Sequence, residues 1–202
     1  MARSSPMGAY NIEDVFFLDV STTITAGTGG NGSTQLDLSA FIDPIYNTRK
    51  SPAVGLAVYR VMYSLSKTAI GSSPLDVDET SVCRFGLVAG AGLGDNATGD
   101  VVLTATSTPM VTNKLAMSGA DYYGSKSTVG NASTGVVNGS NGTIFMEPTK
   151  EVPYVIVRDN VCLVYGQTET AANDLIINAR LECAQVNLNQ DVLNQLLRTQ
   201  TV

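Results

Sequence analysis

The chain has 202 residues and a mass of 21.2 kDa, a size that all-β sandwiches often reach as one domain. Charged residues make up only 15% of the sequence, the net charge is −6, and no cluster of basic residues occurs. This argues against direct nucleic-acid binding, because phosphate contacts require clustered Lys and Arg. The chain has no histidine, the commonest acid–base catalyst and metal ligand near neutral pH, so we expect no enzyme activity and assign no metal or cofactor site.

Residues 1–12 are expected to form an N-terminal arm ahead of the folded domain. Their sequence, MARSSPMGAYNI, lacks the apolar core of a signal peptide. No window of the chain approaches the about 18 apolar residues that a membrane-spanning helix requires. We therefore expect synthesis in the cytoplasm, without secretion by the usual route.

Period-two alternation and β-branched residues predict strands along most of the chain. The clearest case is Gly55–Leu65, where one face is wholly apolar or aromatic and is predicted to face the core; it comprises Ala57, Tyr59, Val61, Tyr63 and Leu65. Further strands are predicted over residues 15–24, 33–41, 81–89, 100–107, 143–146, 154–158, 161–166 and 175–186.

Turn residues and glycine-rich stretches separate these strands. Asp159 and Asn160 tolerate the positive φ of a type I′ turn, so strands 154–158 and 161–166 are predicted to form a hairpin. Stretches rich in Gly, Ser and Asn are predicted to be loops, at 26–32, 90–99 and 118–142.

The stretch GTGGNGST at residues 27–34 resembles the phosphate-binding pattern G-x-x-x-x-G-K-[ST], but Ser33 stands where the lysine belongs. A phosphate-binding loop opens a helix, whose N-terminus holds the phosphates. The residues that follow, STQLDLSAF, alternate as a strand instead. The glycines are therefore interpreted as a hairpin loop that requires positive φ, with no nucleotide site.

The cysteines and the acidic clusters are interpreted as structural features and not as reactive sites. Cys83, Cys162 and Cys183 lie among apolar residues without C-x-x-C spacing, which favours buried thiols within strands. The acidic clusters Asp76–Glu79 and Asp95–Asp100 offer oxygen ligands that suit Ca²⁺, but neither has EF-hand spacing. Solvated loop charge is the favoured interpretation of both, and Ca²⁺ binding stays open.

Residues Asn189–Arg198 form the one predicted helix, within an amphipathic tail at 187–202. Asn189 is the predicted N-cap, and Asp191 and Arg198 suit the two ends of the helix dipole. Such a short helix is not stable alone, so its apolar stripe must pack on its own domain or on a neighbouring subunit. The stripe comprises the candidate assembly residues Val192, Leu193, Leu196 and Leu197.

About eight strands, long uncharged loops and one short helix predict an antiparallel β-sandwich of the jelly-roll type for residues 13–186. This organisation resembles the single jelly-roll major capsid proteins of icosahedral viruses. The segments VFFLDVSTTI, QLDLSAFIDP and GLAVYRVMYSL carry the resemblance, together with late strands that end in an interaction-prone tail.

The resemblance implies a structural virion protein, made in the host cytoplasm, that assembles into an icosahedral shell. Its implied partners are copies of itself and other virion proteins. Many capsid proteins of this kind carry a basic N-terminal arm for the genome, and this chain has none. That departure suits a shell that lies over an internal membrane or is filled by a packaging motor.

A carbohydrate-binding or adhesive β-sandwich is the alternative function. Such modules usually expose Trp or Tyr platforms to the sugar. Trp is absent from this chain, and Tyr122 and Tyr123, in the predicted 118–142 loop, are the best candidates for such a platform.

Overall fold

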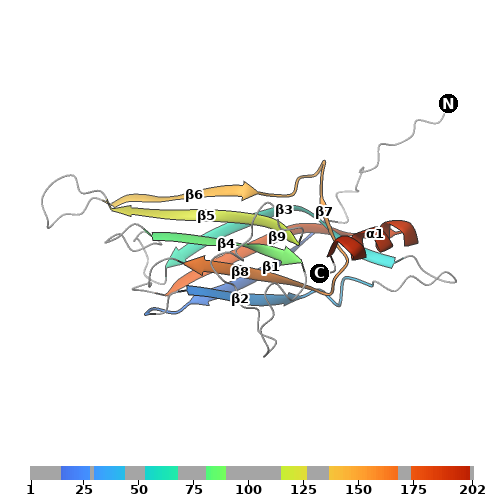
Figure 1. The fold of residues 1–202 in the computed structure, drawn as a ribbon, viewed down its shortest axis with the longest axis horizontal. Helices are drawn as coiled ribbons and strands as arrows, with labels where there is room; N and C mark the ends of the chain where they lie inside the picture. Colours follow the sequence, from blue (N-terminus) through green and yellow to red (C-terminus); the bar gives the residue numbers. More distant parts are fainter. Residues whose placement is uncertain are drawn as a thin grey trace, which may run out of the picture.

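The computed structural model describes residues 15–27, 30–43, 53–67, 81–89, 115–126, 137–167 and 174–200. These ranges contain nine strands and one helix (Figure 1). The elements are β1 (Phe16–Ile24), β2 (Gly30–Asp37), β3 (Ala53–Lys67), β4 (Ser81–Ala89), β5 (Ala116–Lys126), β6 (Val137–Met146), β7 (Tyr154–Ile156), β8 (Asn160–Gln167), β9 (Leu175–Leu188) and α1 (Gln190–Gln200). Several predicted segments lie outside the described residues: the arm at 1–12, the loop at 90–99, the strand at 100–107 and both acidic clusters.

The strands form two antiparallel sheets, which we call sheet A and sheet B. Sheet A has the order β1-β9-β3-β7, and sheet B has the order β2-β8-β4-β5-β6. The pairs are nested along the chain: β1 pairs with β9, β2 with β8, β3 with β7, and β4 with β5. This nesting is the connectivity of a jelly roll. The predicted fold class is confirmed, with β6 added beyond the eight nested strands.

The hydrophobic core lies between the two sheets. Leu56 and Leu181 from sheet A and Phe85 and Leu163 from sheet B are fully buried there. The hydroxyl of Tyr63 on β3 shares a hydrogen bond with that of Ser118 on β5, so these two buried hydroxyls satisfy each other across the two sheets. Within the described residues, no helix has the length and hydropathy to cross a lipid bilayer.

A β-bulge corrects the predicted inward face of β3. Val58 pairs with Cys183 and Arg60 with Glu182 on β9, so Tyr59 is an extra residue and the alternation shifts by one position. Val61, Tyr63 and Leu65 pack in the central core as predicted, but Leu56 and Val58 are the inward residues before the bulge. Ala57 and Tyr59 are buried in a separate cluster with Ala184, so the predicted face was wrong for both.

The predicted hairpin over Asp159 and Asn160 does not form. The three residues of β7 pair with β3 in sheet A, whereas β8 pairs with β2 and β4 in sheet B. The Asp159 carbonyl accepts a hydrogen bond of 2.6 Å from the Leu38 amide, at the end of β2. The chain therefore crosses from one sheet to the other at this point, because each strand finds its partner far away in the sequence.

The predicted loop at 118–142 is also wrong, because β5 and β6 occupy much of it. Small residues in β5 are required by packing and are not a sign of irregular structure. Ala120 lies opposite Phe85 in the ladder, and Gly119 lies opposite Gly86. The ring of Phe85 stacks on Tyr122 with centroids 5.5 Å apart. Bulk on β4 and small side chains on β5 therefore fill one layer of the core together.

The strand predicted at 33–41 is shifted towards the N-terminus. β2 covers Gly30–Asp37, and the chain turns at Leu38, whose carbonyl accepts hydrogen bonds from the amides of Phe41 and Ile42. The Asp37 carboxylate accepts a bond of 2.8 Å from the Ser39 amide, which ends the strand. This backbone hydrogen bond, reinforced by the Ser39 side chain, lowers the pKa of Asp37 below its usual value.

The glycines of GTGGNGST serve backbone geometry and packing. Gly27 has a φ of +77°, so the positive φ expected in this stretch is confirmed at Gly27. A side chain at Gly32 would overlap the ring of Tyr165, its partner across the β2–β8 ladder. The connection is not a hairpin, however, because β1 lies in sheet A and β2 in sheet B. Thr28 and Gly29 lie outside the described residues.

Candidate assembly surface on sheet A and the C-terminal helix

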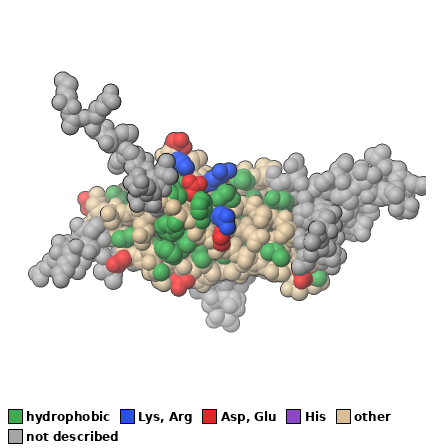
Figure 2. Space-filling model, turned by 180° about the vertical axis from the view of Figure 1, so that it is seen from behind, with side chains coloured by type: hydrophobic (Ala, Val, Ile, Leu, Met, Phe, Trp, Pro, Cys, Tyr) green, Lys and Arg blue, Asp and Glu red, His purple; other side chains and the backbone are tan. Residues whose placement is uncertain are grey.

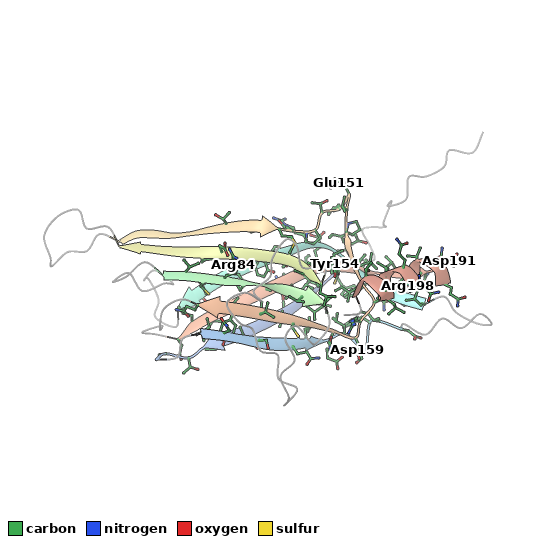
Figure 3. The ribbon with its side chains drawn as sticks, in the orientation of Figure 1. Arg84, Glu151, Tyr154, Asp159, Asp191 and Arg198 are labelled. Atoms are coloured by element: carbon green, nitrogen blue, oxygen red, sulfur yellow. The ribbon has the colours of Figure 1, made fainter. Side chains whose placement is uncertain are left out.

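Helix α1 begins directly after β9, as the sequence predicts. The Asn189 side chain accepts a hydrogen bond of 2.9 Å from the Val192 amide, so Asn189 is the N-cap. Asp191 lies in the first turn and Arg198 in the last, where each charge complements the helix dipole. Figure 3 shows these two residues at opposite ends of the helix, beside the end of the sandwich.

The helix packs on the outer face of sheet A, where β9 ends and β3 begins. Leu193 is only 4% exposed and clusters with Ala53, Val157 and Leu188. Leu196 and Leu197 are partly buried against the same cluster. In the single chain these three leucines of the predicted stripe therefore contact their own domain.

The fourth residue of the stripe, Val192, is turned away from the domain. Its side chain is 40% exposed, although it belongs to the same helical stripe by sequence. The structure thus divides the four candidate assembly residues into three that hold the helix on sheet A and one that reaches solvent. Their contribution to assembly stays a proposal.

Gly55 allows strand β7 and the Leu188 side chain to sit close to β3. A Cβ atom at this position would lie 2.8 Å from Cδ1 of Leu188 and 3.0 Å from the carbonyl oxygen of Ile156. Both distances are shorter than ordinary contacts, so a side chain at Gly55 would displace Leu188 or strand β7. Leu188 belongs to the cluster under α1, so a side chain at Gly55 would also disturb the surface on which the helix packs.

Beyond the bulge the outer face of sheet A becomes polar. Arg180 makes a bidentate pair with Asp19 across the β9–β1 ladder, at 2.6 Å and 2.9 Å. Further ion pairs join Lys150 to Glu182 at 3.2 Å and Arg60 to Glu147 at 3.8 Å. The hydrogen bond from Arg180 lowers the pKa of Asp19. Figure 2 shows basic and acidic side chains next to one another on this side of the molecule.

A shallow concavity of about 450 Å³ lies on this polar half of sheet A. Its polar wall consists of Ser21, Ser64 and Asn178 next to the Asp19–Arg180 pair. The amide of Asn178 donates a hydrogen bond of 3.3 Å to the Ser64 hydroxyl. These groups can hydrogen-bond a ligand, but none of them is a buried titratable group of the kind that marks a catalytic site.

The three cysteines are free and buried, as the sequence predicts. Burial, reinforced by the nearby Asp121 carboxylate, raises the pKa of the Cys83 thiol to about 12. Burial and the neighbouring Glu182 do the same for Cys183. These two thiols are thus protonated near neutral pH and unsuited to nucleophilic chemistry. In the part of the chain that the structure describes, no group of three His, Cys, Asp or Glu side chains could hold a metal ion.

The sequence interpretation missed two features of sheet B. Arg84 makes a bidentate ion pair with Asp121, at 2.5 Å and 2.6 Å, across the β4–β5 ladder. Tyr122 packs against the central core and is not an exposed sugar platform; the side chain of Tyr123 lies outside the described residues. The alternating pattern AMSGADYY was available as a signal for β5, but its glycine and serine content favoured a loop.

Comparisons with known proteins were made by sequence and by structure. No protein-family model matches the chain, and no curated protein matches it. VP1 of Trichodysplasia spinulosa-associated polyomavirus, solved in complex with the GM1 oligosaccharide, aligns with a TM-score of 0.43 and 9% identity, over 89% of this chain and 97% of VP1. The same protein in complex with sialylated precision glycooligomers aligns with a TM-score of 0.40 and 6% identity, over the same shares. The jelly-roll assignment rests on the strand pairing described above, and these alignments carry no conclusion about function.

Proposed function

We propose that this chain is a structural virion protein that assembles with copies of itself into an icosahedral capsid shell. The observation that carries the proposal is the nested jelly-roll pairing, in which β1 pairs with β9 and β2 with β8. Because a fold alone does not define a function, the chemistry of the surface must agree with it. The described surface offers ion pairs, exposed apolar residues and a docked helix, all of which suit contacts between subunits.

The partners follow from the charge of the chain. A net charge of −6 without basic clusters disfavours direct contact with a genome. We therefore expect copies of the chain and other virion proteins as partners, with an internal membrane or a packaged genome beneath the shell. The expected location is the virion.

The carbohydrate-binding alternative loses one of its two candidate platform residues in this structure. Its best candidates for a platform were Tyr122 and Tyr123. Tyr122 stacks on Phe85 within the sandwich, so it cannot present an open aromatic face to a sugar. Assembly is the function that the described residues favour.

The decisive experiment is to measure the mass of the purified protein and to image it by negative-stain electron microscopy. We expect closed particles of one defined mass that form from many copies of the chain. A monomer that persists over a wide range of protein and salt concentrations, with no particles in the images, contradicts the proposal.

A further inference from the structure

The four sheet edges of the sandwich differ in how they are protected. An edge strand presents unpaired backbone N–H and C=O groups, and soluble proteins usually block them with charges, prolines or short strands. In sheet A, β1 carries the Asp19–Arg180 ion pair and β7 has only three residues. In sheet B, β2 ends at the charged Asp37. Strand β6 has ten residues, VNGSNGTIFM, without one charge or proline.

Strand β6 is also the one that the nested jelly-roll pairing does not require. It pairs with β5, and no other described strand pairs with it. In Figure 1 it runs along the upper edge of the molecule, and together with β5 it extends past the ends of the other strands. Among the described residues, the outer edge of β6 has no partner strand, so it can accept a strand from another chain.

The centre of β6 has the geometry for strand pairing. The ladder with β5 has an irregularity on either side of residues 141–144, and between them the register is regular, from Asn141 opposite Tyr123 to Ile144 opposite Ala120. The side chain of Ile144 is 49% exposed, and Thr143 is exposed beside it. A regular backbone segment with an exposed aliphatic side chain is what strand addition uses.

We propose that β6 of one copy pairs antiparallel with β6 of a second copy, about a two-fold axis at residues 141–144. The two copies of sheet B then form one continuous sheet. This inference rests on the proposed self-assembly and names the surface that carries it. A second copy is the occupant because identical strands are self-complementary about a two-fold axis. Each copy has a net charge of −6, and the uncharged β6 brings two copies together without like charges facing each other.

The first test compares Ile144→Lys with the matched control Val152→Lys by sedimentation velocity. Val152 is 73% exposed but lies in the bend after β6, outside any strand. We expect wild type and the control to form dimers or larger species built from them. Ile144→Lys should raise the dimer dissociation constant by about tenfold or more, with unchanged circular dichroism. An unchanged constant in a folded Ile144→Lys protein overturns the inference, as does a wild-type protein that never dimerises.

The second test is disulfide trapping, and it does not depend on the folding of the lysine variant. Because the native cysteines are buried, Thr143→Cys supplies an exposed thiol at the proposed axis. Mild oxidation with diamide should give a covalent dimer of Thr143→Cys, and far less of it from Val152→Cys. Equal or absent cross-linking in the two variants overturns the inference.

The outcomes also separate this inference from the proposed function. If folded Ile144→Lys forms particles normally, the capsid proposal is unaffected, but the β6 contact is not part of the shell. Cross-linked β6 dimers that never grow into particles support the β6 contact and contradict the shell.

Discussion

At Gly55 the absence of a side chain sets the distance between three parts of the molecule. Leu188, strand β7 and the cluster below α1 all approach this position. A comparable approach occurs at Gly32, where the ring of Tyr165 occupies the space of the missing side chain. At both positions glycine is needed for close packing, and neither has a positive φ.

Gly55→Ala is therefore expected to destabilise the protein. The added methyl group must push Leu188 or the β7 backbone away, and such overpacking costs about 1–3 kcal/mol. Urea denaturation followed by circular dichroism measures the change in the free energy of unfolding. Ser66→Thr is the control, because it also adds one methyl group on β3 but at an exposed position. A Gly55→Ala protein as stable as wild type contradicts the packing described here.

At the level of the element, the apolar stripe of α1 is expected to serve both the stability of the domain and its assembly. Its N-cap and charged ends stabilise the helix locally, but three leucines anchor it on sheet A. The exposed Val192 adds no comparable contact to its own domain. Stability and assembly should therefore depend on different residues of the same helix.

Leu193→Asp and Val192→Asp test this division. A buried carboxylate at Leu193 loses the apolar burial and lacks a partner, so we expect a loss of about 3 kcal/mol or more in the free energy of unfolding. Val192→Asp should melt within about 0.5 kcal/mol of wild type, but its particles should be fewer or less stable. Thermal melting and electron microscopy give the two readouts. Normal particles from Val192→Asp would show that this side chain makes no contact between subunits.

At the scale of the whole molecule, the sandwich holds titratable groups that must remain neutral. Cys83 and Cys183 are fully buried, and their pKa values are raised to about 12. Burial also raises the pKa of Tyr154 to about 12 and that of Tyr63 above its usual value. In the unfolded chain the thiols ionise near pH 9 and the tyrosines near pH 10.

This difference predicts a loss of stability in alkaline solution. A group whose pKa is raised by folding stabilises the protein fully below its unfolded pKa, and the contribution is lost as pH rises towards the folded pKa. Between pH 9 and 12, each such thiol should lower the free energy of unfolding by about 1.4 kcal/mol per pH unit. Urea denaturation at pH 8, 9.5 and 11 measures the slope, and Cys183→Ala should reduce it. A profile that stays flat to pH 11 contradicts the burial of these groups.

The sequence by itself determined the features that depend on neighbours along the chain. The period-two pattern predicted β4 at residues 81–89 and most of β9, and Asn189 identified the start of α1. Alternation and capping involve residues close together in the sequence, so these elements can be predicted without knowledge of their partners in the fold. The buried thiols also followed from their apolar surroundings.

The tertiary structure decided which strands pair and which face is buried. Phe16 pairs with Cys183 across more than 160 positions, and no local pattern encodes such a partner. The bulge at Tyr59 follows from the ladder with β9, and small residues in β5 form a strand because Phe85 fills the space beside them. From the sequence, the helix stripe could pack on its own domain or on a neighbouring subunit. The folded sheet A supplies the apolar surface on which three of its residues pack.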